Sequence, residues 1–385
     1  MKQKPTILIL YEYFFPGYKA GGPVQSLVNL ITALQNEYSF VVITTAFDLI
    51  SHNPYDTVQQ NRWNNVSLPN GAEIKVWYAG KGKPTLFELN KLFKQINPKV
   101  IYLNGIYSYR LFLQPLLIHF FSPSAKIVIC PRGMLQKGAL SVKRGKKKYY
   151  IRMLQKSGLL KKCSWHSTNH EESLDIRAYF PVNKSVLIAP NIPKTPLRAF
   201  SILDKKAGKL KLVYLSLITE KKNLLLLLQI FQSLPNSVQL YIYGPVKDVQ
   251  YWENCKKYID LMPLKVKFMG DILPENVQQT LAQYHAMIIL TKGENFGHAL
   301  YESLSVGRPV ITSYFTPWNN LLALKAGANV NISDTKDCEK LINYFASMTQ
   351  VKYNEFCGGA FNFANEYFNN LKTTKQYREL FEIPE

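Results

Sequence analysis

The sequence predicts an α/β protein with two Rossmann-like, doubly wound domains that face each other across a central cleft. The length of 385 residues suits two domains of ordinary size, and the 47% hydrophobic content is enough for a large core in each. Short apolar runs alternate with longer segments of helical spacing in both halves, a pattern typical of parallel sheets covered by helices. Residues 191–209 interrupt this alternation with prolines and a Lys-Lys-Ala-Gly-Lys turn, so we interpret them as a linker.

In the first half, apolar residues recur at helical spacing from Val24 to Leu34, which predicts a helix directly after the first strand. The longest apolar stretch, residues 111–121, is interrupted by polar residues and falls far short of the roughly 20 residues that span a bilayer. We therefore expect a first domain over residues 1–190 and no membrane crossing. Its strands are predicted at residues 7–10, 40–45, 74–78, 100–103, 126–130 and 186–189.

In the second half, the alternation restarts at residue 210, and a helix is predicted over residues 223–234. The second domain is expected to end at residue 352, and residues 353–385 are expected to form a C-terminal helix that packs back toward the first domain. Open α/β sheets bind ligands at the carboxyl ends of their strands, so the active site is predicted there. The strands of this half are predicted at residues 210–215, 238–243, 266–269, 286–290 and 310–312.

Charge and cysteine content narrow the function classes. Lys and Arg number 47 against 26 Asp and Glu, a formal net charge of +21, which favours an anionic partner such as a phosphorylated small molecule, an acidic membrane or nucleic acid. The five cysteines include no Cys-x-x-Cys pair, so neither a disulfide framework nor a zinc site is indicated. This usage favours a reducing compartment.

The most specific motif lies after the predicted strand at residues 286–290. Glu294 and Glu302 stand eight residues apart, with Asn295, Phe296 and Gly297 following the first of them. A glycine at a helix start lets phosphate approach the backbone N–H groups, which lack partners inside the helix. Two carboxylates at this spacing can accept hydrogen bonds from the hydroxyl groups of one ligand.

This Glu-x7-Glu pattern, with Phe-Gly inside it and Gly-x-Pro after it, resembles the donor-binding signature of retaining glycosyltransferases of the GT-B fold, family 4. The resemblance extends over nearly the whole chain and favours a bacterial subgroup that builds surface polysaccharide. It implies that Glu294 contacts the donor sugar, that Glu302 binds the ribose, and that Phe296 and Gly297 lie against the sugar and diphosphate, with Asn295 beside them. The further matching segments are Tyr-Gly-Pro-Val at 243–246, Met-Gly-Asp at 269–271 and Thr-Pro-Trp-Asn at 316–319.

A second phosphate-binding segment is expected at residues 215–224. It resembles the family's loop in which an Arg and a Lys grip the diphosphate, and Lys222 occupies the Lys position. Leu217 stands where the family has the Arg, so fewer charge-assisted bonds to phosphate are available. Stabilisation of the leaving group then falls more heavily on Lys222, which we predict to be catalytic together with Glu294 and Arg132.

The first domain is expected to supply the acceptor side and part of the donor site. Gly21 and Gly22 match a Gly-Gly loop that in the family lies near the reacting sugar and phosphate. Arg132 and Gly133 lie in a Pro-Arg-Gly-Met-Leu loop where many relatives have His, and an Arg is a poor general base because it stays protonated. His166 lies in a segment that resembles the family's His-Ala-Thr-Ser-x-x-Glu and is predicted on the acceptor side.

No cofactor and no metal ion are expected. The sequence contains no Asp-x-Asp triplet, the spacing that glycosyltransferases of the other major fold use to hold a metal. His166 and His170 stand four apart, but no third zinc ligand is evident. The resemblance implies retention of the anomeric configuration, with attack assisted by the leaving phosphate. Helix N-termini and Lys222 would stabilise that phosphate.

Residues 137–162 hold ten Lys or Arg and no acidic residue, interleaved with apolar residues. Such a segment can lie on an anionic membrane surface, or can be a plain solvated face. No nucleic-acid motif accompanies it, so nucleic acid is not expected as a partner. The residues predicted at the membrane surface are Lys143, Arg144, Lys146, Lys147 and Lys148.

Taken together, these features predict an enzyme that moves a sugar from a nucleotide-sugar donor to a hydroxyl of a lipid-linked or oligosaccharide acceptor. We expect it at the cytoplasmic face of a bacterial inner membrane, in lipopolysaccharide, O-antigen or capsule biosynthesis. A glycosyl phosphorylase or nucleotide-sugar epimerase of the same fold is an alternative, and a basic non-enzymatic scaffold or nucleic-acid-binding protein is an alternative of another class.

Overall fold

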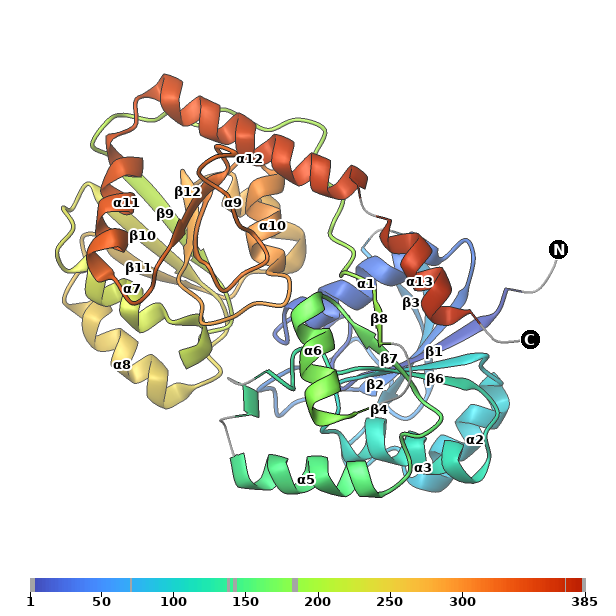
Figure 1. Cartoon of the computed structure of the whole chain (residues 1–385). Helices are drawn as coiled ribbons and strands as arrows, with labels where there is room; N and C mark the ends of the chain where they lie inside the picture. The colour runs from blue at the N-terminus through green and yellow to red at the C-terminus, as the bar shows by residue number, and fades with distance from the viewer. Residues whose placement is uncertain are drawn as a thin grey trace. The chain divides into compact units, whose positions relative to one another are not determined.

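The computed structural model describes residues 4–69, 71–136, 139–140, 144–181, 186–370 and 372–382. The chain divides into two compact units, one made of Met1–Ile192 with Lys372–Glu385 and the other of Pro193–Leu371. Each unit holds a sheet whose strands are joined by helices (Figure 1). The predicted fold class, two parallel-sheet Rossmann-like domains, is confirmed. No helix in the described ranges combines the length and the apolar composition needed to cross a membrane.

The first unit is built on an eight-stranded sheet in the order β3-β4-β2-β1-β5-β6-β7-β8. All neighbouring strands are parallel except β3, which runs antiparallel to β4 at one edge. The strands are β1 Thr6–Leu10, β2 Ser39–Thr45, β3 Trp63–Ser67, β4 Glu73–Ala79, β5 Val100–Asn104, β6 Lys126–Cys130, β7 Ser164–Ser167 and β8 Val186–Ile188. The helices are α1 Gly22–Leu34, α2 Leu86–Ile96, the π-helical turn η1 Tyr109–Leu113, α3 Gln114–Phe121, α5 Arg144–Lys156, α6 His170–Tyr179 and α13 Thr373–Phe381.

Both faces of this sheet are buried, because successive residues of a strand point to opposite faces. In β1, Ile7 and Ile9 pack into a cluster that includes α1 and α13, whereas Leu8 and Leu10 pack into a cluster that includes α2, α3 and α5. The near-continuous apolar run of β1 therefore belongs to a central parallel strand.

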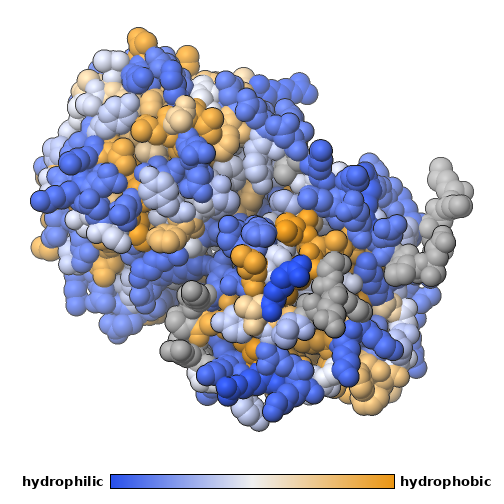
Figure 2. Space-filling model, viewed as in Figure 1, coloured by the Kyte–Doolittle hydropathy of each residue, from blue (hydrophilic) through white to orange (hydrophobic). Residues whose placement is uncertain are grey.

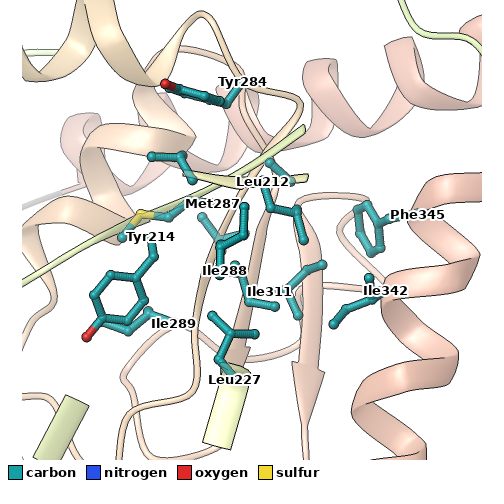
Figure 3. Close-up of a cluster of buried hydrophobic side chains, with 14 of the residues drawn as sticks. Leu212, Tyr214, Leu227, Tyr284, Met287, Ile288, Ile289, Ile311, Ile342 and Phe345 are labelled. Carbon is teal, nitrogen blue, oxygen red and sulfur yellow. The ribbon is translucent and has the colours of Figure 1, made fainter. Parts of the chain in front are cut away.

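The second unit has a six-stranded parallel sheet in the order β11-β10-β9-β12-β13-β14. Figure 3 shows Ile342 and Phe345 turned from their helix toward Ile311 in this sheet. The strands are β9 Leu210–Leu215, β10 Val238–Tyr243, β11 Val266–Gly270, β12 Ala286–Ile289, β13 Val310–Ser313 and β14 Gly327–Val330. The helices are η2 Glu220–Lys222, α7 Leu224–Phe231, α8 Val249–Asp260, η3 Pro274–Asn276, α9 Val277–Leu281, α10 His298–Ser305, α11 Thr335–Ser347 and α12 Gln350–Asn370.

The unit boundaries differ in detail from the expected domains. Most of the expected linker belongs to the second unit, because Arg308, which is 1% exposed, donates to the carbonyl oxygen of Ser201 at 3.0 Å. The expected C-terminal helix is two helices. Tyr353 of α12 lies in the core of the second unit, and Tyr377 of α13 lies in the core of the first.

The topology of the second sheet places a candidate ligand-binding site at its carboxyl edge. In the second sheet the connections run outward from β9 through β10 to β11 on one side, and from β12 through β13 to β14 on the other. The loops that follow β9 and β12 therefore diverge at the carboxyl edge of the sheet. This is the switch point at which doubly wound sheets bind ligands.

Candidate functional site

The loop after β9 is shaped by a close backbone approach from the neighbouring strand. A Cβ atom on Gly244, whose φ is 134°, would lie 1.9 Å from the carbonyl oxygen of Ser216, so only glycine fits there. The Ile218 N–H also donates to the Pro245 carbonyl at 2.9 Å. These contacts hold residues 216–219 against the β10 loop and lead the chain into η2, which ends at Lys222.

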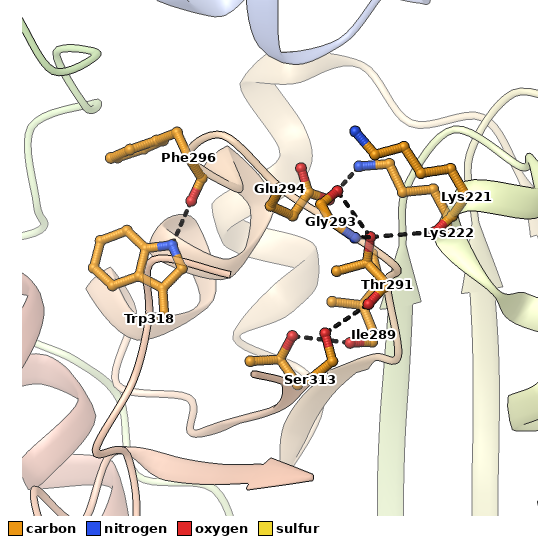
Figure 4. Close-up of polar contacts among 10 residues, drawn as sticks. Lys221, Lys222, Ile289, Thr291, Gly293, Glu294, Phe296, Ser313 and Trp318 are labelled. Atoms are coloured by element: carbon orange, nitrogen blue, oxygen red, sulfur yellow. Dashed lines mark hydrogen bonds and ion pairs between the residues drawn. The ribbon is translucent and has the colours of Figure 1, made fainter. Parts of the chain in front are cut away.

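Lys222 and Glu294 form an ion pair across the switch point (Figure 4). The two side chains come from the loops after β9 and β12 and are 19% and 13% exposed. The Glu294 backbone N–H donates to the Phe315 carbonyl at 2.9 Å, which fixes where its side chain begins. The structure thus brings together the two residues that the sequence predicts as catalytic in this half of the chain.

Lys221 adds a second ammonium group to the same edge (Figure 4). Burial lowers its pKa, the Glu294 carboxylate acts in the opposite direction, and the Lys222 charge lowers the pKa further. The Lys221 carbonyl accepts from the Lys292 N–H at 2.8 Å, which ties the β9 loop to the β12 loop. Two lysines around one carboxylate leave this edge positively charged.

The turn before Glu294 is held by hydroxyl groups. The Thr291 hydroxyl lies 3.1 Å from the Gly293 carbonyl and 3.3 Å from that of Lys221, and it accepts from the Gly293 N–H at 3.2 Å. The Ser313 hydroxyl donates to the Thr291 carbonyl at 2.6 Å. Because each of these contacts involves the backbone, the loop is preorganised around Glu294.

The helix that follows begins at a glycine, as predicted. Gly297 caps α10 with a φ of 79°, and a Cβ atom there would lie 3.0 Å from the Leu300 Cδ1 atom. The Trp318 indole N–H donates to the Phe296 carbonyl at 2.5 Å, which holds residues 296 and 297 in place. The N-terminus of α10, whose first N–H groups have no partner inside the helix, therefore follows directly after the Glu294 loop.

Glu302 lies in the second turn of α10 and is 8% exposed. Burial raises the pKa of its carboxyl group to about 7, and the nearby positive charge of Lys194 opposes this rise. A carboxyl with this pKa exchanges its proton near neutral pH. Leu217, at the position where the resemblance would place an arginine, is a half-buried residue of the β9 loop, so it brings no positive charge to this edge.

In the first unit, Arg132 is the centre of a hydrogen-bond network. Its guanidinium group donates to Asn104 Oδ1 at 2.9 Å, to Asn191 Oδ1 at 2.7 Å and to the Tyr102 hydroxyl at 3.2 Å. These partners come from β5 and from the segment after β8. The sequence gives no sign of them, because single Asn and Tyr residues are common at strand ends.

His166 contacts this network through the Tyr102 hydroxyl. The ring is fully buried, its Nε2 donates to the Ala189 carbonyl at 2.8 Å, and its Nδ1 lies 2.7 Å from the Tyr102 hydroxyl. Burial first, and then the Arg132 charge, lower its pKa to about 3, so the ring is neutral and its Nδ1 accepts a hydrogen bond from the Tyr102 hydroxyl. The sequence predicts an acceptor contact for His166, but a buried ring with both nitrogens engaged positions Arg132 through Tyr102 instead.

The loop that carries Arg132 is anchored by Glu172, another residue without a predicted role. This 1% exposed carboxylate accepts from the Gly133 N–H at 2.6 Å, and from the Thr168 N–H and hydroxyl at 2.8 and 2.7 Å. Arg132 and Gly133 both have positive φ, at 55° and 73°. Three hydrogen bonds to one buried carboxylate stabilise that unusual backbone.

Gly21 and Gly22 lie at the start of α1, which begins two residues before the helix predicted from Val24. Gly21 is the N-terminal cap with a φ of 70°, and nothing lies within 4 Å of where its Cβ atom would be. Asp48, which sequence reasoning missed, accepts from the N–H groups of Tyr18 and Lys19 at 2.9 and 3.1 Å. This carboxylate holds the loop so that the helix start stays open.

Residues 144–156 of the basic segment form α5, in which the buried apolar residues do not face solvent as the amphipathic pattern suggests. Ile151 and Leu154 are buried against the first sheet rather than available to a membrane. Lys146 and Lys148 are exposed, whereas the Lys147 ammonium donates to the Ala139 carbonyl at 2.6 Å. Lys143 lies outside the described residues, and α5 begins at Arg144.

Within the described ranges, no three His, Cys, Asp or Glu side chains gather in a way that could hold a metal ion. This observation does not test whether the reaction needs a metal ion, so metal independence stays a prediction.

Comparison with known proteins adds a domain assignment. Residues 198–352 match the family described as Glycosyl transferases group 1. No curated protein matches the chain.

Similar solved structures cover nearly the full length. Sucrose-phosphate synthase from Thermosynechococcus elongatus has a TM-score of 0.71 at 15% identity, over 98% of this chain and 99% of that chain. Anabaena Alr3699/HepE in complex with UDP and glucose has a TM-score of 0.68 at 14% identity, over 97% and 98% of the two chains. WaaG, a glycosyltransferase involved in lipopolysaccharide biosynthesis, has a TM-score of 0.65 at 13% identity, over 98% and 99%. Residues 198–352 thus match a group 1 glycosyltransferase domain, within a chain that has the GT-B fold.

Proposed function

We propose that this chain transfers a sugar from a nucleotide-sugar donor to a hydroxyl of a lipid-linked glycan, with retention of the anomeric configuration and without a metal ion. The observation that carries the proposal is the Lys222–Glu294 ion pair at the switch point of the matched domain. The pair joins a cation suited to a diphosphate and a carboxylate suited to sugar hydroxyls, beside a helix N-terminus that favours anions.

The proposed step follows from these positions. The bond between the sugar C1 and the diphosphate oxygen breaks, and a bond from C1 to the acceptor oxygen forms on the same face. The acceptor proton passes to the departing phosphate. Lys222, with Lys221 beside it, stabilises the charge that develops on the leaving group. Glu294 and Glu302 accept hydrogen bonds from donor hydroxyls, and the backbone at Phe296 and Gly297 lies along the donor.

Arg132 serves the acceptor side in this proposal. A guanidinium group stays protonated and cannot act as a general base, but its hydrogen-bond partners fix its orientation. Such a rigid group can hold a hydroxyl or an anionic group of the acceptor. Gly21 and Gly22 would contribute backbone N–H groups from the start of α1.

Two comparisons support the finer parts of the proposal. One similar structure contains UDP and glucose, and another is that of a glycosyltransferase involved in lipopolysaccharide biosynthesis. They support a nucleotide-sugar donor and a place in bacterial surface polysaccharide biosynthesis. The net charge of +21 supports a peripheral position on an anionic membrane, at the cytoplasmic face of the inner membrane.

The test is a donor screen with the full-length protein. UDP-, GDP-, dTDP- and ADP-sugars are added, and thermal stabilisation and nucleoside diphosphate release are measured with and without EDTA. We expect one class of donor to stabilise the protein and to be hydrolysed slowly, with no effect of EDTA. The anomeric carbon of the released sugar should keep its configuration in NMR spectra recorded before the sugar mutarotates. Stabilisation by inorganic phosphate alone, with no response to any nucleotide sugar, would contradict the proposal.

A further inference from the structure

The first unit carries a long segment free of negative charge. Between Glu88 and Glu171 the sequence has sixteen Lys and Arg and no Asp or Glu. Glu88, at the start of this stretch, does not neutralise any of these sixteen residues, because its carboxylate is paired with Lys83 at 2.8 Å. The segment runs from α2 through α3 and α5, so the positive charge extends well beyond α5 itself.

These three helices cover one face of the first sheet. Apolar residues of α2, α3 and α5 pack into the same core cluster, on the side opposite α1 and α13. Figure 2 shows hydrophilic surface over α5 and a hydrophobic patch toward α2 and α3, along one edge of this unit. The outer surfaces of the helices thus form one flank, which we call the α3–α5 flank.

The outward face of α5 is basic with a small apolar strip. Tyr149, 75% exposed, and Met153, 38% exposed, stand four residues apart and so share one face of the helix. Lys146, Lys148 and Arg152 are exposed around them. Long basic side chains beside a short apolar strip can reach lipid phosphates while their stems lie on apolar surface.

The end of α3 supplies a larger apolar group. Phe120 and Phe121 are 52% and 80% exposed, and their rings meet edge to face at 5.3 Å. Burial lowers the pKa of His119, the residue before Phe120, and the charge of the exposed Lys162 lowers that pKa further, so Lys162 lies near the end of α3. Two exposed phenylalanines next to a histidine ring that feels the Lys162 charge form an apolar tip within a basic surface.

We propose that the α3–α5 flank binds an anionic lipid bilayer, with Phe120 and Phe121 inserted into the interfacial layer and the lysines of α5 and of residues 161–162 on the lipid phosphates. This inference rests on the proposed function, which places the acceptor in a membrane. It assigns the insertion to α3, whereas the apolar residues of α5 are mostly committed to the core. Charge complementarity selects a negatively charged bilayer as the partner, and aromatic rings favour the interface between lipid and water.

The experiment is sedimentation of the full-length protein with vesicles of phosphatidylcholine alone or with 30% phosphatidylglycerol (roughly the charge density of an anionic leaflet). The Phe120→Ser/Phe121→Ser variant is compared with Leu261→Ser/Leu264→Ser, a matched pair of exposed apolar residues in the second unit. We expect the phenylalanine variant to lose about tenfold or more in binding to anionic vesicles, and the leucine variant to bind normally. Equal binding of both variants would overturn the inserted tip.

Charge is tested in the same way. Lys146→Glu/Lys148→Glu should release the protein from anionic vesicles, whereas Lys336→Glu/Lys340→Glu on α11 should not, and wild-type binding should weaken as salt rises. Equal effects of the two charge reversals, equal binding to neutral vesicles, or binding to a single-stranded oligonucleotide but to no vesicle would overturn the proposal. Nucleoside diphosphate release by each variant in solution is the separate measure of the proposed function. A wild-type protein that hydrolyses the donor but binds no anionic vesicle contradicts only the surface, and one that binds vesicles but hydrolyses no donor contradicts only the function.

Discussion

At the scale of single residues, the second unit's site depends on opposite charges that hold each other in place. Lys222 and Glu294 are both largely buried, so removing either one leaves the other as an uncompensated charge near the interior. A bound diphosphate would give Lys222 a second anionic partner and release Glu294 for sugar hydroxyls. Leu217 brings no charge to the β9 loop, so Lys221 and Lys222 are the cations that lie around Glu294 there, and Lys292 of the β12 loop is paired with Glu220.

The first prediction concerns Lys222→Ala. Loss of a charge-assisted hydrogen bond costs about 1.5–3 kcal/mol, so nucleoside diphosphate affinity should fall roughly 10- to 100-fold. The control is Lys292→Ala, because Lys292 is exposed and paired with Glu220 at 3.1 Å. Isothermal titration calorimetry measures both. An unchanged affinity in Lys222→Ala would show that other groups neutralise the phosphates.

The second prediction concerns the pH dependence of Glu302. Its pKa of about 7 in the folded chain lies above the ordinary 4.5, so its contribution to stability is present below about pH 4.5 and is lost as the pH rises toward 7. Glu302→Gln cannot ionise, so its free energy of unfolding should gain on that of the wild type as the pH rises. The difference between the two proteins should be about 2–3 kcal/mol larger at pH 8 than at pH 5. Urea titrations at the two pH values measure this, and an equal difference at both would rule out a buried carboxyl that titrates near neutrality.

At the scale of elements, α13 links the end of the chain to the Arg132 network. The Tyr377 ring meets the His166 ring at 5.3 Å, and the Phe381 ring meets the Tyr102 ring at 5.5 Å. Arg378 adds an ion pair to Glu37 at 2.6 Å on the exposed side. The helix therefore covers the residues that position Arg132, although it lies more than 200 residues away in the sequence.

The third prediction is that Tyr377→Ala destabilises the first unit by about 3–5 kcal/mol, the cost of truncating a buried aromatic side chain. Hydrogen exchange should accelerate in β5 and β7 but not in β9 and β12. Val351→Ala on α12 is the control, because Val351 is 72% exposed and should change stability by less than about 0.5 kcal/mol. Equal acceleration in both sheets would contradict the assignment of α13 to the first unit.

Elements with a strong apolar signal could be predicted from the sequence, and weak ones could not. The central strands β1 and β9 are apolar along most of their length, because both of their faces are covered. The edge strand β3 reads Trp-Asn-Asn-Val-Ser and is half exposed, and β14 begins with a glycine, so neither has a strand pattern. Tertiary pairing with β4 and β13 forms these two strands, and pairing partners are not visible in a local pattern.

The candidate site shows the same division. Glu294 and Lys222 could be proposed because the segments that carry them resemble motifs of GT-B glycosyltransferases, and each segment follows a recognisable strand. The roles of Glu172 and Asn191 could not, because each depends on a contact with the Arg132 loop, which lies 39 or more residues away in the sequence. The burial of His166 was likewise invisible, since a histidine near a strand end is equally compatible with a surface position.

At the scale of the whole molecule, the two proposed functions, lipid binding and donor binding, fall in different units. The stretch between Glu88 and Glu171 concentrates positive charge on the first unit, while residues 198–352 carry the matched glycosyltransferase domain. Lipid binding and donor binding are therefore predicted to be separable by mutation, because their residues lie in different units.

The central claim is that the switch point of the second unit binds and cleaves a nucleotide sugar. The most direct measurement is single-turnover release of nucleoside diphosphate from the preferred donor by wild type and by Glu294→Gln, with donor affinity measured in parallel. A Gln keeps the size of the side chain but loses the charge that pairs with Lys222. The account predicts a release rate at least about tenfold lower in the variant, the effect of losing about 1.4 kcal/mol of transition-state stabilisation. Equal release rates and equal donor affinity in the two proteins would contradict it.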